Sequence, residues 1–258
     1  MTLLEKILEA KRREVAGRKK IKPLSELKKR SEAPRFTRDF KGSLKGTSIQ
    51  LIGEIKKVSP LHGMLRRSFD PEALARSYQR GGAASLSVLT DEPFFGGRLA
   101  YLKEVRSTVS LPLLRKDFIL EEYQVYESAE AGSDALLLIS SLLAEKELSF
   151  LMQCAKRIGM ASLVEVHSEE DLEKALWVEA EIIGINNRDL RTFKVNFLTS
   201  ERLVKRIPKE KIIVSESGIH SRKEVKRLEA LGFHAVLIGQ AFMERPDMEK
   251  AMHEVMGR

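Results

Sequence analysis

The residues best suited to chemistry in this sequence stand in Gln50 to Gly63, where charged side chains interrupt an apolar run. Glu54 and Lys56 are two positions apart, and an extended strand places such residues on the same face. Burying an acid and a base on one face costs free energy unless they pair or border a solvent-filled site. The stretch therefore predicts either part of an active site or an edge strand with a solvated ion pair.

Polar groups also follow other short apolar runs at corresponding places. After the first run these are Ser59, and after the later ones Thr90-Asp91, Arg115-Lys116-Asp117, Glu165, Asn186-Asn187-Arg188-Asp189 and Ser215-Glu216-Ser217-Gly218. Carboxylates and lysines held near one another can act as general acids and bases. If the runs are parallel strands of one barrel, their carboxyl ends meet at one rim, and these side chains should gather there.

The elements that would position these groups are eight apolar runs, each followed by a helical pattern. The runs are residues 51–55, 85–89, 112–114, 135–139, 162–166, 182–185, 211–214 and 235–238, and the helical patterns are residues 71–80, 99–107, 123–131, 144–157, 169–177, 199–206, 222–231 and 248–256. Eight such units predict an α/β fold, the (β/α)8 TIM barrel. An open doubly wound sheet that binds a dinucleotide would carry a glycine-rich turn after its first strand, and Val58 to Gly63 has one glycine.

The first part of the chain precedes these units. Residues 3–17 have apolar side chains at helical spacing and predict an amphipathic helix that ends before Pro23. A second helix is predicted over residues 24–30, and a polar connection over 33–47. We expect one domain, 1–258, in which 1–48 is an N-terminal helical extension and 49–258 is the barrel.

Composition limits the class of protein. Of 258 residues, 43% are hydrophobic and 32% charged, which is typical of a globular chain with a substantial core. With Cys154 as the single cysteine, no intramolecular disulfide is possible. The first twenty residues lack the uninterrupted apolar segment of a signal peptide or membrane span, so we expect a cytoplasmic protein with no membrane partner.

The net charge of +8 leaves nucleic-acid binding open as an alternative function. The basic residues are spread along the chain without interleaved aromatics, and they cluster only in Lys11 to Lys22. A solvated helical face explains that cluster equally well. We therefore expect no nucleic-acid partner, and the surplus charge favours an anionic substrate.

Two glycines near the end of the chain indicate what kind of anion. Ser217-Gly218 follows the seventh run and Gly239-Gln240 the eighth, where many barrels bind phosphate through backbone N–H groups. Each glycine alone could simply form a tight turn. Together they favour a phosphorylated substrate.

Seven segments, in this order, make the sequence similar to the indole-3-glycerol phosphate synthase family of tryptophan biosynthesis. They are GEIKKVSP from Gly53, SVLTDEPFFGG from Ser87, LLRKDFI from Leu113, LVEVH from Leu163, GINNRDL from Gly184, VSESGI from Val214 and LIGQAFM from Leu237. The resemblance implies a lyase that converts 1-(2-carboxyphenylamino)-1-deoxyribulose 5-phosphate into indole-3-glycerol phosphate, carbon dioxide and water. It implies no cofactor and no metal, and we expect a monomer, with a weak dimer as the alternative.

The same resemblance implies roles for single residues. Lys116 would be the general acid at the ribulose carbonyl, and Lys56 would face the substrate carboxylate or the leaving hydroxyl. Glu54 and Glu165 would share acid–base and electrostatic roles, and which of them takes the proton stays open. We also expect that nearby cations, Arg115 beside it and Lys56 across from it, make the Lys116 proton more available.

The remaining site residues are expected to bind substrate. Those around the sugar and ring are Ser59, Phe95, Phe118, Leu137, Asn186, Arg188, Leu190 and Glu216, and those around the phosphate are Ser217, Gly218, Leu237, Gly239 and Gln240. Phe118 and Leu137 could equally be ordinary core residues, and His167 is expected to be structural. The sequence departs from the family pattern at Leu61-His62, Gln240 and Asn196. Another phosphate-binding barrel enzyme, an isomerase or aldolase, is the alternative activity.

Overall fold

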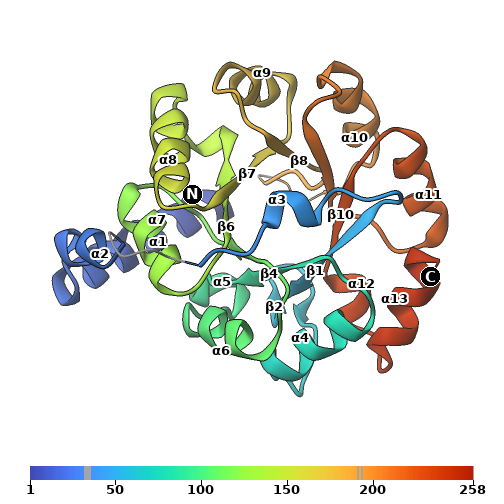
Figure 1. The fold of residues 1–258 in the computed structure, drawn as a ribbon, viewed down its shortest axis with the longest axis horizontal. Coiled ribbons are helices and arrows are strands. Elements are labelled where there is room, and N and C mark those ends of the chain that lie inside the picture. Colours follow the sequence, from blue (N-terminus) through green and yellow to red (C-terminus); the bar gives the residue numbers. More distant parts are fainter. Residues whose placement is uncertain (32–35, 191, 193, 258) are drawn as a thin grey trace.

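Eight parallel strands form a closed ring in the computed structural model, which describes residues 1–31, 36–190, 192 and 194–257 (Figure 1). The strands are β1 (Gln50–Ile55), β4 (Ser85–Leu89), β5 (Leu113–Lys116), β6 (Ala135–Ile139), β7 (Ala161–Val166), β8 (Ile182–Asn186), β9 (Ile212–Glu216) and β10 (Ala235–Ile238). Each strand pairs with its neighbours in sequence, and β1 pairs with both β4 and β10, which closes the ring. The predicted TIM barrel is confirmed.

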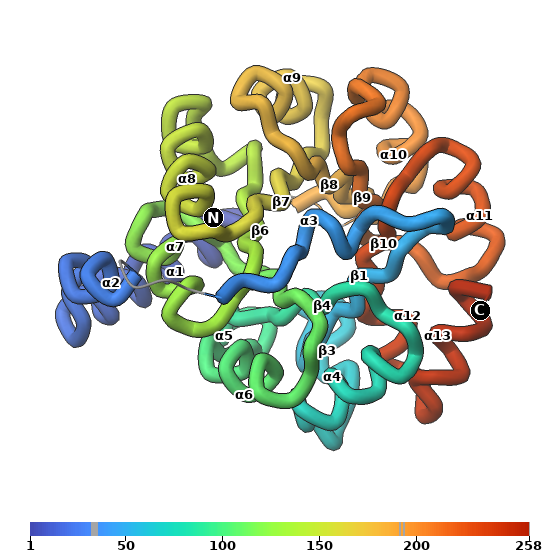
Figure 2. The backbone as a smooth tube through the Cα atoms, viewed as in Figure 1, coloured from blue at the N-terminus to red at the C-terminus, as the bar shows by residue number. Residues whose placement is uncertain are grey.

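Helices surround the ring (Figure 2). They are α4 (Pro71–Arg80), α6 (Ala100–Thr108), α7 (Glu122–Glu130), α8 (Glu145–Arg157), α9 (Glu169–Trp177), α10 (Leu198–Leu203), α11 (Arg222–Ala230) and α13 (Met248–Met256), with 3-10 turns η1 (Ser140–Leu142) and η2 (Val204–Arg206). Side chains of Asp70, Ser168, Ser221 and Asp247 accept backbone hydrogen bonds at four helix N-termini. These caps explain why the helices begin close to where the apolar periodicity predicts.

Side chains alternate between two apolar layers along each strand. Outward-facing residues such as Leu86, Val88 and Val164 pack under the helices. Inward-facing residues such as Leu114 and Leu163 fill the barrel. The alternation is what separates neighbouring charged residues at the strand ends onto opposite faces.

The extension touches the barrel at several places. Helix α1 (Leu3–Ile21), which begins with a Thr2–Glu5 capping box, packs against α7, and α2 (Leu24–Ser31) lies beside α7. The prediction of a polar connection over 33–47 is wrong in part, because Phe40–Ser43 form the short helix α3. Phe40 and Leu44 are buried and close the amino-terminal end of the barrel, and Figure 1 shows α3 lying across the ring. Residues 33–35 of that prediction lie outside the described residues.

One hairpin and two short helices were not predicted. Strands β2 (Val58–Ser59) and β3 (Gly63–Met64) make a hairpin directly after β1, and the side chain of Leu61 is exposed at its turn. Two short helices, α5 (Glu92–Phe95) and α12 (Gln240–Met243), follow β4 and β10. All three elements border the rim where the strands end.

Candidate active site

One cavity at the carboxyl ends of the strands is lined by all the predicted site residues. They are Glu54, Lys56, Ser59, Phe95, Lys116, Phe118, Leu137, Glu165, Asn186, Arg188, Leu190, Glu216, Ser217, Gly218, Leu237, Gly239 and Gln240. Most come from the carboxyl-terminal half of a strand or from the segment that follows it, because parallel strands bring those positions to one rim. The edge-strand alternative for β1 is wrong, since β1 is paired on both sides.

Lys116, the last residue of β5, lines the cavity between two carboxylates. Its Nζ is 2.9 Å from Oε2 of Glu165 on β7 and 2.9 Å from Oε2 of Glu216 on β9. Lys56, which directly follows β1, has its Nζ 2.7 Å from Oε2 of Glu54 on β1, so the predicted shared face is confirmed. We call Glu54, Lys56, Lys116, Glu165 and Glu216 the rim cluster.

The ionisation of Lys116 differs from the sequence-based expectation. Burial disfavours the ammonium, but Glu165, Glu216 and Glu54 outweigh it and raise the pKa of Lys116 well above its ordinary value. The expectation that neighbouring cations loosen its proton is wrong, because Arg115 points away from the cavity and the groups in contact with Lys116 are carboxylates. Lys116 is therefore held as an ammonium at neutral pH.

The two carboxylates that bind Lys116 differ in ionisation. Burial, with the charges of Glu165 and Glu54, raises the pKa of Glu216 to about 7, although Lys116 opposes this. For Glu165 burial acts in the same direction, but Lys116 and His167 outweigh it and hold its pKa well below the ordinary value. Glu165 is thus a fixed anion, whereas Glu216 exchanges a proton near neutral pH. Two neighbouring carboxylates whose pKa values are shifted in opposite directions are typical of acid–base sites.

Glycines make room for these carboxylates. A Cβ atom on Gly184 would collide with Oε1 of Glu216, and one on Gly239 would collide with the carboxylate of Glu54. Any side chain at either position would displace a member of the rim cluster. Neither glycine is needed for a positive φ, so close approach is what they provide.

The cavity has one polar wall and one apolar wall. Asn186 Oδ1 accepts a hydrogen bond from the backbone N–H of Arg188 at 3.0 Å, which fixes the turn after β8. On the other side the rings of Phe95 and Phe118 are 6.2 Å apart between centroids. Phe118 and Leu137 are buried and also line the cavity, and their contact with the substrate stays a prediction.

The turn after β9 is unusual in its backbone, and the turn after β10 leads into a short helix. Ser217 and Gly218 have φ of 66° and 77°, and a serine rarely adopts that region. Such strained residues concentrate at functional sites. After β10, Gly239 is the N-cap of α12, and the side-chain amide of Gln240 donates to Glu244 Oε1 at 2.8 Å.

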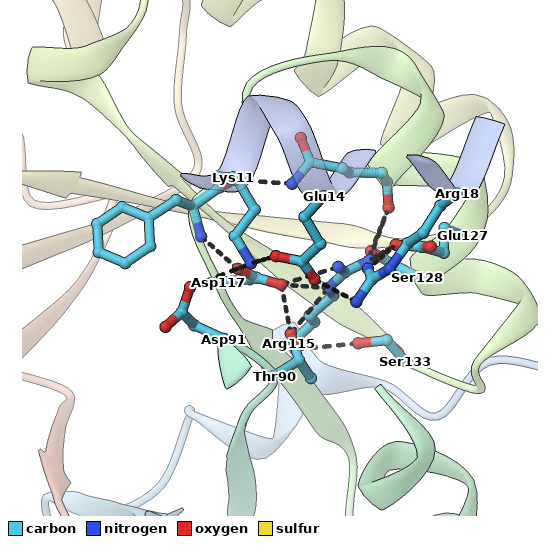
Figure 3. A network of polar contacts seen from close by, with 12 residues as sticks. Lys11, Glu14, Arg18, Thr90, Asp91, Arg115, Asp117, Glu127, Ser128 and Ser133 are labelled. Atoms are coloured by element: carbon cyan, nitrogen blue, oxygen red, sulfur yellow. Dashed lines mark hydrogen bonds and ion pairs between the residues drawn. The ribbon is translucent and has the colours of Figure 1, made fainter. Parts of the chain in front are cut away.

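A second charged cluster, two members of which also line the cavity, includes a residue that sequence reasoning missed (Figure 3). Lys11 of α1 is fully buried, with Nζ 3.1 Å from Asp91 Oδ2 and 2.8 Å from Asp117 Oδ1. Arg115 Nη2 is 2.8 Å from Asp117 Oδ2, and its Nη1 is 2.9 Å from Glu127 Oε2. We call these five residues the buried cluster.

A signal for Lys11 was present in the sequence. Leu4, Ile7, Leu8 and Val15 form the apolar stripe of α1, and Lys11 falls on the same stripe at helical spacing. A lysine at such a position is buried only if it is paired. Asp91 and Asp117, which follow β4 and β5, supply the partners and also line the cavity.

Several cations of the basic stretch Lys11 to Lys22 have carboxylate partners elsewhere in the chain. Arg18 pairs with Glu127, Lys19 with Glu121 and Lys22 with Glu130, all on or next to α7. The interpretation as a solvated face is wrong for Lys11. Because these cations already have carboxylate partners, the pattern weakens the nucleic-acid alternative.

The fold and the site together define a barrel enzyme whose ionisable groups converge at the carboxyl-terminal rim. Two solved structures share the fold at low identity: an N-acetylmannosamine-6-phosphate 2-epimerase from Clostridium perfringens (TM-score 0.60, 15% identity, 84% of this chain and 96% of that one) and KGPDC from Streptococcus mutans (TM-score 0.61, 12% identity, 80% and 94%). The family model described as indole-3-glycerol phosphate synthase matches residues 4–255. The chain belongs to this family.

Curated relatives agree over nearly the whole length. The indole-3-glycerol phosphate synthase of Caldanaerobacter subterraneus subsp. tengcongensis is 48% identical over 242 residues, which cover 94% of this chain and 93% of the relative. That of Desulforamulus reducens is 47% identical over 256 residues, covering 98% and 97%. Among the described residues, no helix is long and apolar enough to cross a membrane.

Proposed function

We propose that this chain catalyses the family reaction, closure of 1-(2-carboxyphenylamino)-1-deoxyribulose 5-phosphate to indole-3-glycerol phosphate with loss of carbon dioxide and water. The observation that carries the assignment of roles is Lys116, a buried ammonium held between two carboxylates inside the cavity. Ring closure places negative charge on the ribulose carbonyl oxygen. A protonated lysine that lines the cavity can stabilise that charge and supply the proton.

The steps after ring closure need a base and a second acid. When the ring carbon that bears the carboxylate attacks the carbonyl carbon, loss of carbon dioxide returns the electron pair of the broken bond to the ring. Departure of the resulting hydroxyl as water then requires one proton to be delivered and another to be removed. Glu216, with a pKa of about 7, can do either near neutral pH. Glu165 stays ionised and orients Lys116.

Lys56 and Glu54 serve the substrate carboxylate and the leaving hydroxyl in this proposal. Their ion pair places an ammonium and a carboxylate side by side at the end of β1. In the strand order of the ring, β1 lies opposite β7, the strand that carries Glu165. Lys56 binds the anionic carboxylate until carbon dioxide leaves. The pH dependence of kcat in a Glu54→Gln variant tests whether Glu54 exchanges a proton in that step.

The remaining lining residues bind the substrate. Asn186 and Arg188 position the sugar, Ser59 lies at the first loop, and Phe95, Phe118, Leu137 and Leu190 enclose the aromatic ring. The backbone of the turns at Ser217-Gly218 and Gly239-Gln240, together with Leu237, binds the phosphate. Gln240 contributes its backbone, because its side-chain amide is engaged by Glu244.

The test is turnover of the carboxyphenylamino substrate by the purified chain, followed by the fluorescence of the indole product. Saturable turnover with release of one carbon dioxide per indole supports the proposal. Absence of indole, with turnover of a phosphorylated sugar in a substrate panel, would favour the isomerase or aldolase alternative. We further propose that the extension and the barrel work as one domain in the cytoplasm, and sedimentation of the active species distinguishes the expected monomer from a weak dimer.

A further inference from the structure

His167 contacts Glu165 of the rim cluster, and the proposed reaction gives it no role. It follows β7 directly, two residues after Glu165, and its side chain is 14% exposed. Its Nε2 lies 3.2 Å from Oε1 of Glu165, the oxygen that does not bind Lys116. Lys116 and His167 therefore hold Glu165 from its two oxygens.

The other side of the imidazole faces the start of α9. His167 Nδ1 is 4.0 Å from Oδ2 of Asp171. That carboxylate is itself fixed, because it accepts hydrogen bonds from the backbone N–H groups of His167 at 3.1 Å and Ser168 at 3.2 Å. The ring thus stands between a catalytic carboxylate and a helix-capping carboxylate, both ordered by other contacts.

The charges around the ring favour the imidazolium. Facing it are Glu165 of β7, Asp171 of α9 and Glu216 of β9, with Lys116 of β5 beyond Glu165. Burial lowers the pKa of His167, but these three carboxylates outweigh it and raise the pKa above its ordinary value. Among the described residues neither ring nitrogen has a well-aligned hydrogen-bond partner, so a neutral ring would leave buried polar atoms uncompensated. An ion pair with Glu165 removes that cost.

We propose that His167 is a positioning residue for the reaction: as an imidazolium it fixes Oε1 of Glu165, and Glu165 in turn presents Oε2 to the catalytic ammonium of Lys116. This rests on the proposed function of Lys116. When the ring loses its proton, Glu165 is free to rotate and Lys116 loses one of its two anchors. Activity therefore falls as pH rises through the pKa of His167, which contrasts with the structural role expected from sequence.

Two substitutions separate charge from shape. His167→Gln keeps a polar side chain without charge and is expected to lower kcat about tenfold to a hundredfold with KM changed less than about twofold, and to remove the His167 step from the alkaline limb. His167→Lys keeps a cation to higher pH and is expected to restore part of kcat and move that step upward by more than about one pH unit.

The matched control is His234→Gln. His234 is also half-buried, but it lies at the start of β10, where its Nδ1 accepts a hydrogen bond from the N–H of Ile213 at 3.1 Å. We expect wild-type kcat and an unchanged pH profile. If His167→Gln behaves as this control does, the inference is overturned.

A titration by NMR tests the contact without turnover. With ring-labelled histidine, the His167 resonances of the wild type should titrate above the ordinary value of about 6.5, and Glu165→Gln should lower that pKa by about one unit or more. A His167 pKa unaffected by Glu165→Gln overturns the inference even if the His167 variants fold poorly. Failure of the proposed function is distinct, because then the wild type itself yields no indole.

Discussion

The rim cluster and the buried cluster both combine acidic and basic side chains and lie next to each other, but they do different things. Arg115, Lys116 and Asp117 are consecutive, yet Lys116 enters the cavity whereas Arg115 and Asp117 join the buried cluster. Strand alternation turns Arg115 and Lys116 to opposite faces. The function of a charged residue here depends on which elements cover its face of the strand.

The two clusters also differ in how far they are exposed. Lys11 has carboxylate oxygens of Glu14, Asp91 and Asp117 within 3.1 Å, and the side chains of Lys11, Asp91 and Asp117 are at most 1% exposed. In the rim cluster, Lys116 Nζ has two carboxylate oxygens at 2.9 Å, but its side chain is 14% exposed and lines the cavity. Ion pairs buried under the extension serve stability, whereas a partly exposed ammonium beside a cavity is accessible to a ligand.

The strongest test of the rim cluster is Lys116→Met. We expect kcat for indole formation to fall about 10²- to 10⁴-fold, because the general acid is lost. Far-ultraviolet circular dichroism and cooperative urea unfolding should remain. Lys226→Met on the exposed face of α11 is the control and should keep wild-type kcat. Substantial indole formation by folded Lys116→Met would contradict the catalytic assignment.

Arg115→Met tests the buried cluster. The change leaves Asp117 and Glu127 buried without the guanidinium, so we expect the free energy of unfolding to fall by about 3–5 kcal/mol in urea titrations. Arg13→Met provides the comparison, since its pair with Glu9 is exposed, and we expect a change within about 0.5 kcal/mol. If Arg115→Met were as stable as Arg13→Met, the buried cluster would not be structural.

Glu216→Gln should show that the ionised side chain of Glu216 in the rim cluster lowers the free energy of unfolding. The pKa of Glu216 is about 7 in the folded state and about 4.3 in an unfolded chain, so the folded protein binds this proton more tightly. That contribution is complete below about pH 4 and is lost as pH rises through 7. We therefore expect the glutamine variant to be more stable than wild type by about 1–3 kcal/mol at roughly pH 8, and similar at roughly pH 4.

Asp117→Asn should behave in the opposite sense. Despite its burial, Arg115 and Lys11 hold the pKa of Asp117 below its ordinary value, so its carboxylate stabilises the fold above about pH 3.9, and this is lost as pH falls. At neutral pH we expect the asparagine variant to be less stable than wild type. Urea titrations that gave both variants the same sign at pH 8 would remove the distinction between the two clusters.

Most of the barrel and the position of the site could be predicted from sequence. Strand alternation and helical periodicity gave the eight units, and the carboxyl ends of the strands gave the lining of the cavity. What Lys116 contacts could not be predicted, because Glu165 and Glu216 lie on strands far away in sequence. The same is true of α3. In the sequence Phe40 is an isolated aromatic in a polar connection, and only the folded barrel shows that it closes one end.

Buried and exposed ion pairs both attach the N-terminal extension to the barrel, so their contributions to stability can be compared within one interface. Lys11 is fully buried, whereas the Lys22 side chain is 31% exposed and pairs with Glu130 at 2.7 Å. Solvent and salt weaken an exposed pair, and Arg30 also binds Glu130, so Lys22→Ala leaves that carboxylate partnered.

We expect Lys22→Ala to lower the free energy of unfolding by less than about 1 kcal/mol at low salt, and the loss to disappear near roughly 0.5 M sodium chloride. Lys11→Met, which strands Asp91 and Asp117 in the interior, should cost more and keep its cost in salt, since screening does not reach a sealed pair. Urea titrations of both variants at the two salt concentrations measure this. Equal, salt-sensitive losses would mean that the outer pairs, and not the buried cluster, hold the extension on the barrel.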